Sequence, residues 1–257
     1  MITSSHNSKI QQVRGLLGRS KDPRETGAFV AEGVRLVEEA LRANWPFQFV
    51  LAGESLSERG RTLVADLQSR GVETETVVNN LMQSVSETET SQGILAVLDY
   101  SQLPLPQSLS FVLILDQIRD PGNLGTLLRT AAAAGVQAVF LPPESTEAFS
   151  PKVVRAGMGA HFRLPIHPLT WDEIRTFTQD LKIHLADTEG SISYWQADFR
   201  VPLALIVGGE AEGASQPARE LATSQITIPM PGKTESLNAA VAGAILLFEI
   251  VRQRSRK

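Results

Sequence analysis

The segment that most constrains the fold is the run of apolar and small residues from Ala239 to Phe248, which follows a proline-rich turn. A short strand over Ile226 to Ile228 must stop at Pro229, because proline has no N–H group to donate to a sheet ladder. Beyond a Pro-Gly turn, Ser236 is expected to cap a helix that runs to Arg252. This helix has no clean polar face, so it must be buried in a core or in a subunit interface.

Two other segments also combine a buried strand with a polar turn that contains glycine. The strand Leu203–Val207 runs into Gly208–Gly213, and the strand Phe111–Leu115 leads through a polar turn into the helix Leu124–Ala134. Glycine lets a backbone approach a ligand closely, and the carboxyl ends of parallel strands line ligand crevices. The three turns therefore predict a site for a small ligand.

The chain is predicted to form two domains with a linker over residues 101–110, where Pro104 and Pro106 favour an extended connection. In residues 1–100, alternating helices and strands predict a small α/β domain. Its expected strands are near Phe29–Ala31, Phe47–Ala52, Glu73–Val78 and Gly93–Leu98, and its expected helices are Lys9–Leu17, Leu36–Leu41, Glu58–Arg70 and Asn79–Ser84.

Residues 111–257 show the alternation that is typical of a parallel sheet with helices on both faces. Expected strands are Phe111–Leu115, Val136–Leu141, Lys182–Ala186, Leu203–Val207 and Ile226–Ile228. Expected helices are Leu124–Ala134, Pro151–Gly157, Trp171–Asp180, Gln216–Leu221 and Ser236–Arg252. No Gly-x-Gly-x-x-Gly follows the first strand, which argues against a nucleotide-dependent oxidoreductase.

Three motifs stand in a fixed order: Asn123–Ala131 is the first, Val207–Gly213 the second, and Ile228–Gly232 with Ser236–Asn238 the third. Together they resemble the SpoU (TrmH) family of RNA ribose 2′-O-methyltransferases, a branch of the SPOUT class. The resemblance runs from about Phe111 to the end of the sequence, and it implies a deep trefoil knot in the C-terminal part. The sequence departs from the family pattern at position 209, where it has glycine and the family often has Asn.

Two stretches, Ile2–Ser4 with Asn7 and residues 29–38, resemble more weakly the small substrate-binding domain that precedes the methyltransferase domain in many members. The implied cofactor is S-adenosylmethionine, held in the knot mainly by backbone groups. Carried over to this sequence, the cofactor contacts are Gly208, Ile228 and Leu237, with Thr188 and Met230 as further candidates. From the residues alone, Ile228 and Leu237 are better explained as plain core.

The catalytic residues implied by the resemblance are Arg129, Asn123, Glu210, Ser236 and Asn238. Arg129 is a lone cation in an apolar helix, so it is either a salt-bridged core residue or a functional group that grips an RNA phosphate and orients the 2′-hydroxyl. Asn123 steers Arg129 or the ribose, or simply caps its helix. Glu210 pairs with Arg129 or Asn123, or caps a helix, while Ser236 and Asn238 face the ligand or close the turn.

The composition limits the possible partners and compartments. A net charge of −4 argues against nucleic-acid binding, although basic residues gather from Lys9 to Arg42 and from Arg252 onward. Charge alone favours solvated surface groups there, and only the resemblance favours RNA. Cysteine is absent, which excludes disulfides and thiolate chemistry and fits a cytoplasmic enzyme.

The sequence predicts neither a membrane-spanning segment nor a metal site. The amino terminus lacks the apolar core of a signal peptide, and Ala239–Phe248 is far shorter than the ~20 residues that span a bilayer. His161, His167 and His184 are not spaced as a metal cluster. His6 and Asn7 are expected in a flexible leader, where they reach RNA only if the leader folds back.

The leading hypothesis is an S-adenosylmethionine-dependent RNA ribose 2′-O-methyltransferase whose first domain binds the RNA. Ribosomal RNA of the 23S type is preferred as substrate, because the two-domain layout resembles the members directed at ribosomal RNA. The alternatives are a transfer-RNA methyltransferase and a non-catalytic RNA-binding assembly factor. The resemblance also implies a homodimer packed through the C-terminal helix, although burial within one chain explains that apolar helix equally well.

Overall fold

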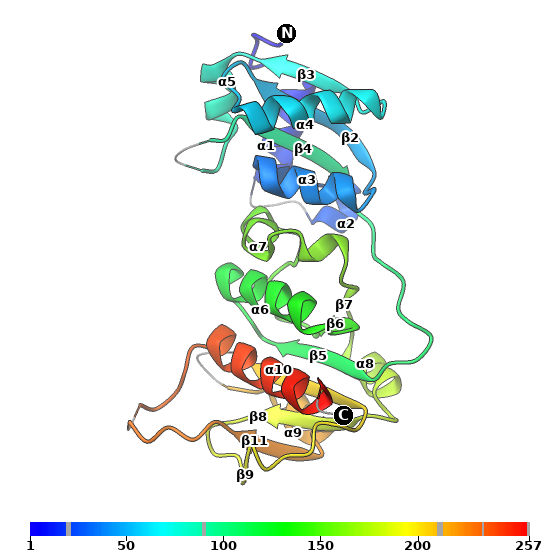
Figure 1. Ribbon diagram of the computed structural model, residues 1–257, viewed down its shortest axis with the longest axis vertical. Helices are drawn as coiled ribbons and strands as arrows, with labels where there is room; N and C mark the ends of the chain where they lie inside the picture. The colour runs from blue at the N-terminus through cyan, green and yellow to red at the C-terminus, as the bar shows by residue number, and fades with distance from the viewer. Residues whose placement is uncertain (19–21, 89–90, 210–212, 233, 256–257) are drawn as a thin grey trace. The chain divides into compact units, whose positions relative to one another are not determined.

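The computed structural model describes residues 1–18, 22–88, 91–209, 213–232 and 234–255. The chain forms two compact units: Met1–Ser101 with Phe149–Phe162, and Gln102–Ala148 with Arg163–Lys257. Each unit has its own sheet (Figure 1). Among the described residues, no helix has both the length and the apolar character needed to span a membrane.

The first unit is built on a mixed four-stranded sheet of order β1-β4-β2-β3, in which β4 runs antiparallel to β1 and β2, and β3 runs parallel to β2. Its strands are β1 (Ala28–Glu32), β2 (Phe47–Gly53), β3 (Thr74–Val77) and β4 (Ile94–Asp99). Its helices are α1 (Ser8–Leu17), α2 (Pro23–Thr26), α3 (Val34–Arg42), α4 (Glu58–Ser69), α5 (Asn79–Ser84), α7 (Pro151–Gly157) and the 3-10 helix Ala160–Phe162.

The residues before α1 are fixed to the sheet, so the prediction of a flexible leader is wrong. Ile2 is buried, and its N–H donates to the Thr76 carbonyl at 2.7 Å, which pairs the leader with β3. The Asn7 side chain accepts from the N–H of Lys9 at 3.0 Å and thereby caps α1. A buried apolar side chain and a helix cap therefore determine the position of this segment.

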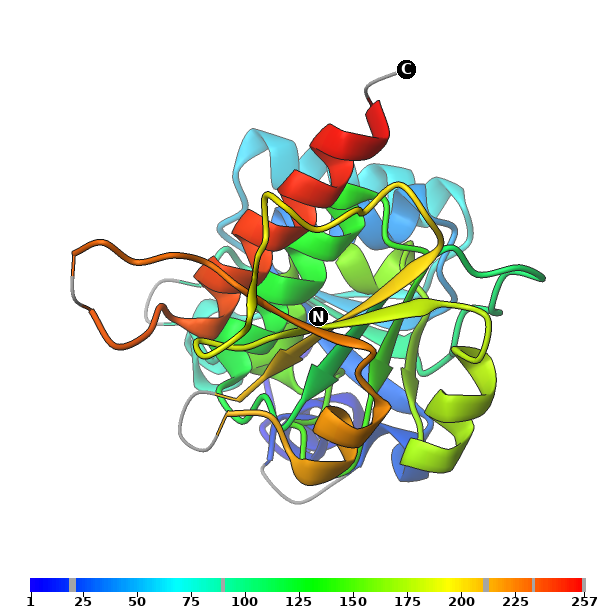
Figure 2. The same cartoon turned by 90° about the horizontal axis from the view of Figure 1, so that it is seen from below.

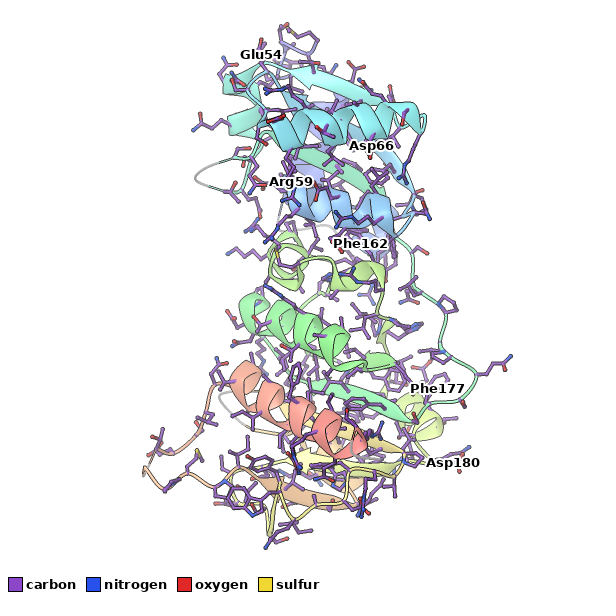
Figure 3. All side chains as sticks on the ribbon, in the orientation of Figure 1. Glu54, Arg59, Asp66, Phe162, Phe177 and Asp180 are labelled. Atoms are coloured by element: carbon purple, nitrogen blue, oxygen red, sulfur yellow. The ribbon has the colours of Figure 1, made fainter. Side chains whose placement is uncertain are left out.

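The segment Phe149–Phe162 packs into the first unit, although it lies beyond the second unit's first strands in sequence. The Phe29 ring on β1 lies 5.1 Å from the ring of Phe149, and Trp45 lies 5.3 Å from the ring of Phe162, which Figure 3 labels. Aromatic pairs at such distances stabilise a core beyond the area that they bury. The hydrophobic pattern of α7 gave no indication of this partner.

The second unit is a seven-stranded sheet of order β7-β6-β5-β10-β8-β11-β9, and every pairing is parallel, which confirms the predicted parallel sheet. Its strands are β5 (Phe111–Asp116), β6 (Ala138–Leu141), β7 (Ile166–Pro168), β8 (Lys182–Ala186), β9 (Ile192–Ser193), β10 (Leu203–Gly208) and β11 (Ser224–Thr227). Its helices are α6 (Pro121–Ala134), α8 (Trp171–Phe177), α9 (Gln216–Leu221) and α10 (Ala239–Ser255).

Helices cover both faces of this sheet, with α6 and α10 side by side on one face and α8 and α9 on the other (Figure 2). A Cβ atom at Gly243 would lie 2.4 Å from Cδ2 of Leu127, so glycine lets α10 pack closely on α6. On the other face, the hydrophobic core includes Ile174 from α8 and Leu221 from α9, which pack against side chains of the central strands. This arrangement leaves the carboxyl ends of the strands to the connecting turns.

Several element boundaries differ from the predictions, and three of these differences lie in the second unit near its later elements. The helix α10 begins at Ala239 instead of Ser236, because the Asn238 side chain accepts from the N–H groups of Ala240 and Val241 at 2.9 and 3.2 Å and caps it. The strand β11 ends before Ile228. The helix α8 ends at Phe177 instead of Asp180, both labelled in Figure 3.

Candidate active site

A cavity of ≈ 430 Å³ lies at the carboxyl ends of β8, β10 and β11. Its wall consists of the turns that follow these strands, together with side chains from α9 and α10. Most of the turn residues are small or apolar, and Asp187, Thr188, Glu189 and Ser236 are the polar residues among them. A cavity of this size at this edge of a parallel sheet suits a small ligand.

Glycine is required at two positions in the turn after β10. A Cβ atom at Gly208 would lie 2.8 Å from the nitrogen of Ala214, and one at Gly209 would lie 2.5 Å from the carbonyl oxygen of Gln117. Gly209 also pairs with Gly213 in an antiparallel bridge, so the turn folds back on itself. The close approach of Gln117 explains why this chain carries glycine at position 209.

All five predicted cofactor-binding residues line this one cavity: Thr188, Gly208, Ile228, Met230 and Leu237. Ile228 and Leu237 are only partly buried; Ile228 follows the end of β11, and Leu237 precedes the start of α10. The interpretation of these two side chains as plain core is therefore wrong. The predicted catalytic residue Ser236 also lines the cavity.

The first and third motifs meet through two asparagines. The Asn238 side-chain amide donates to the side-chain oxygen of Asn123 at 3.0 Å. Asp120, and not Asn123, caps α6, because the Asp120 carboxylate accepts from the N–H of Asn123 at 2.8 Å. The Asn123 side chain is thus directed to the other motif instead of to its own helix terminus.

Arg129 is exposed on α6, two turns beyond Asn123, and it does not line the cavity of its own chain. No described side chain or backbone group forms a hydrogen bond or ion pair with it, which excludes the interpretation as a salt-bridged core residue for the described part of the chain. Glu210, the remaining predicted catalytic residue, lies outside the described residues.

Three charged residues of the cavity wall, Asp187, Glu189 and Arg219, were not predicted from the sequence. Arg219 on α9 donates through Nη1 to the Asp187 carboxylate at 2.6 Å and through Nε to the carbonyl of Ala214 at 3.3 Å. This arginine therefore ties the turn after β8 to the turn after β10. The position of Asp187 directly after a predicted strand was an available signal, whereas nothing in the sequence indicated Arg219.

His184 lies in the middle of β8 and takes no part in the cavity wall. Its Nδ1 is 2.7 Å from the Ser224 hydroxyl, and its ring lies edge-on to Phe199. Burial lowers the pKa of His184 to about 4, so the ring is neutral near pH 7. Among the described residues, no group of His, Asp and Glu side chains is arranged to hold a metal ion.

Two family patterns match the chain. Residues 110–248 match the SpoU rRNA Methylase family, and residues 7–96 match the MRM3-like substrate binding domain. The 23S rRNA (guanosine(2553)-2′-O)-methyltransferase RlmP of Bacillus subtilis is 33% identical over 97% of this chain and 98% of its own length. The 23S rRNA (uridine(2479)-2′-O)-methyltransferase of Streptomyces viridochromogenes is 30% identical over 98% of this chain and 92% of its own length.

The fold also matches solved structures over nearly the whole chain. The SpoU methyltransferase AviRb from Streptomyces viridochromogenes, crystallised with the cofactor AdoMet, superposes with a TM-score of 0.86 at 27% identity, covering 96% of this chain and 99% of that one. The family matches, the two relatives and this structure all agree with the motifs that surround the cavity. The chain therefore belongs to the SpoU rRNA methylase family.

Proposed function

We propose that this protein transfers a methyl group from S-adenosylmethionine to a ribose 2′-hydroxyl of 23S-type ribosomal RNA. The observation that carries the proposal is the convergence of the second and third motifs on a single cavity, with the first motif joined to the third by the Asn238–Asn123 hydrogen bond. The relatives named as 23S rRNA 2′-O-methyltransferases support this choice of RNA. A ribosomal substrate in turn favours a cytoplasmic location.

The residues of the cavity fit the cofactor. Ile228, Leu237 and Leu246 offer an apolar surface to a flat base, and the glycine turn after β10 offers backbone groups at close range. The ion pair of Asp187 and Arg219 adds one charge of each sign to the same wall. When bound, S-adenosylmethionine supplies an electrophilic methyl carbon on a sulfonium sulfur.

Arg129, Asn123 and Asn238 are proposed to align the RNA with the cofactor. The Arg129 guanidinium grips a phosphate next to the target ribose, because its planar fork matches phosphate oxygens and its exposed position leaves it accessible. A guanidinium is too weakly acidic to serve as the base at neutral pH. As the C–O bond forms and the C–S bond breaks, the hydroxyl proton passes to water or to a neighbouring acceptor, with Asn123, Ser236 and Glu210 orienting the ribose.

A homodimer is proposed because a single chain leaves an apolar surface of α10 exposed and leaves Arg129 outside the cavity. On α10, Val241 and Phe248 are 49% and 50% exposed, and with Ile245 they form an apolar stripe at helical spacing. Arg129 also lies outside the cavity of its own chain. A second copy packed on this stripe would cover the apolar surface and bring its Arg129 to the cavity.

A trefoil knot is proposed for the C-terminal part of the second unit. It is supported by hydrogen bonds that join the end of α10 to the loop between β9 and β10. Gln253 accepts from the N–H of Phe199 at 3.0 Å and donates to the Ala197 carbonyl at 3.1 Å, while Arg254 donates to the Phe199 and Val201 carbonyls at 2.9 and 2.8 Å. Tracing the chain through this loop in a crystal structure tests the knot.

The first unit is proposed to bind the RNA substrate; it comprises the predicted domain of residues 1–100 with Ser101 and Phe149–Phe162 added. Its match to a substrate-binding domain supports this role. The alternative of transfer RNA keeps the same chemistry, and the alternative of a non-catalytic assembly factor keeps only the fold. The choice among the three depends on what the purified protein methylates.

The decisive experiment is transfer of labelled methyl from S-adenosylmethionine to total RNA of a strain that lacks this protein. Alkaline hydrolysis then locates the product, because 2′-O-methylation blocks cleavage. We expect labelled 23S RNA with wild-type protein, none with Arg129→Ala, and unchanged labelling with the control Arg175→Ala, which removes an exposed arginine from α8. If transfer RNA is labelled instead, the substrate is transfer RNA and not 23S RNA. If the protein binds the cofactor but methylates neither RNA nor ribosomal particles, it is an assembly factor.

A further inference from the structure

Asp116, the last residue of β5, is buried beneath the second motif. Its exposed fraction is 1%, although carboxylates seldom lie out of contact with water unless they are paired. Its Oδ2 accepts from the N–H of Ser215 at 2.7 Å, and no described group donates to its Oδ1. Burial raises the pKa of Asp116, while hydrogen bonding from Ser215 opposes the rise. The chain therefore retains a carboxyl group at a position where burying it is costly.

This carboxyl group connects two motif segments that are far apart in sequence. Asp116 pairs with Gly208 across β5 and β10, and Ser215 caps the start of α9. The turn from Gly208 to Ser215 is thus fixed at its first end by strand pairing and at its second end by the Asp116 hydrogen bond. Gly208 and Ala214, which belong to this turn, both line the cavity.

We infer that Asp116 is a positioning residue for the cofactor cavity: its carboxyl group fixes the start of α9 against the end of β5 and so holds Gly208 and Ala214 in place. This inference rests on the proposed function. Asp116 does not itself line the cavity, so it acts through the turn and not by contact with the cofactor. Without an acceptor at residue 116, the partly buried N–H of Ser215 loses its partner and the turn relaxes.

The inference is tested by breaking the hydrogen bond from each side. Asp116→Ala removes the acceptor. Ser215→Pro removes the donor, and the Ser215 backbone, at φ −63° and ψ 163°, already has the φ value that proline requires. Because it also removes the hydroxyl that caps α9, its effect is measured relative to Ser215→Ala, which removes the hydroxyl and keeps the N–H. Asp116→Asn keeps an acceptor oxygen of the same shape. The control Thr178→Val removes a buried hydroxyl hydrogen bond at the end of α8, away from the cavity wall.

The quantities to measure are the Kd for S-adenosylmethionine by calorimetry, and kcat with the KM values for cofactor and RNA. We expect Asp116→Ala and Ser215→Pro each to raise the Kd for the cofactor about tenfold or more, with the KM for RNA unchanged. Asp116→Asn should stay within about threefold of wild type. Combining Asp116→Ala with Ser215→Pro should add little, since both remove the same bond.

Several outcomes would overturn the inference. One is an unchanged Kd for the cofactor in Ser215→Pro or in Asp116→Ala; if the alanine variant does not fold, Ser215→Pro decides. Another is an Asp116→Asn variant as weak as Asp116→Ala, since charge and not hydrogen bonding would then matter. An equal loss in Thr178→Val would show a general effect on stability. If wild-type protein binds no S-adenosylmethionine, the proposed function itself fails, and this result is distinct from the others.

Discussion

The side-chain amide of Asn238 lies 3.0 Å from the side-chain oxygen of Asn123, and the same Asn238 caps α10 by accepting from two backbone N–H groups. One side chain therefore starts the last helix and joins it to α6. Its oxygen performs the first task and its nitrogen the second. The two tasks can be separated by substitution.

Asn238→Asp should keep the cap and lose the bond to Asn123, because a carboxylate accepts from N–H groups but has no proton to donate. We expect near wild-type thermal stability and a kcat about tenfold lower. Asn238→Ala should also lose the cap, at about 1 kcal/mol of unfolding free energy. Thermal unfolding and methyl transfer at saturating substrates measure the two effects. Full activity of Asn238→Asp would show that the bond to Asn123 is unimportant.

Gly209→Ala should disrupt the turn after β10, since the added Cβ would meet the carbonyl oxygen of Gln117 at 2.5 Å. Overpacking of this kind costs about 1–3 kcal/mol, and we expect it as a KM for S-adenosylmethionine raised about tenfold or more. Gly232→Ala is the matched control, because nothing lies within 4 Å of a Cβ atom at that position. Equal KM values in the two variants would contradict the steric explanation.

Phe248→Asp should separate the proposed dimer, because it places a charge in the apolar stripe of α10. Sedimentation should show a dimer for the wild type and a monomer for the variant, with methyl transfer lost as the partner's Arg129 is withdrawn. Val201→Asp alters another exposed apolar residue, outside α10, and should leave the dimer intact. A wild-type monomer with full activity would rule out a site completed by a second copy.

Stability should fall with acid partly through His184. Its pKa in the folded protein is about 4, below the value of about 6.5 expected in the unfolded chain. Between these values the unfolded chain binds the extra proton, so the unfolding free energy decreases as the pH falls from about 6.5 to about 4, by no more than roughly 3 kcal/mol. Denaturant unfolding across this range should show a flatter dependence in His184→Asn.

The strength of the local signal decided which parts of the fold could be predicted. The buried strand Leu203–Val207 reads as apolar at every position, and it corresponds to β10 with one added residue. The strands β7 and β9 are only three and two residues long, so neither has room for a recognisable pattern. The start of α10 was misplaced because Ser236 and Asn238 are both good caps, and only the observed hydrogen bonds distinguish them.

The site was predictable where a residue's role depends on its neighbours in sequence. The glycine turn after β10 and the proline turn after β11 impose backbone geometry locally, and both line the cavity. The Asp187–Arg219 ion pair joins residues on different elements, and the Asp116–Ser215 bond joins residues still farther apart. Such contacts follow from the order of the strands in the sheet, which the alternation of elements alone does not specify.

The cavity wall also determines how the protein could respond to an inhibitor. At Gly208 and Gly209, neighbouring backbone atoms leave no room for a Cβ atom. A compound that forms hydrogen bonds with the main-chain groups of this turn would keep these bonds after most side-chain substitutions elsewhere in the cavity wall. A substitution of Gly208 or Gly209 by a bulkier residue could block the compound, but it would also displace the backbone on which cofactor binding depends. A change that excludes such a compound would therefore tend to exclude the methyl donor as well.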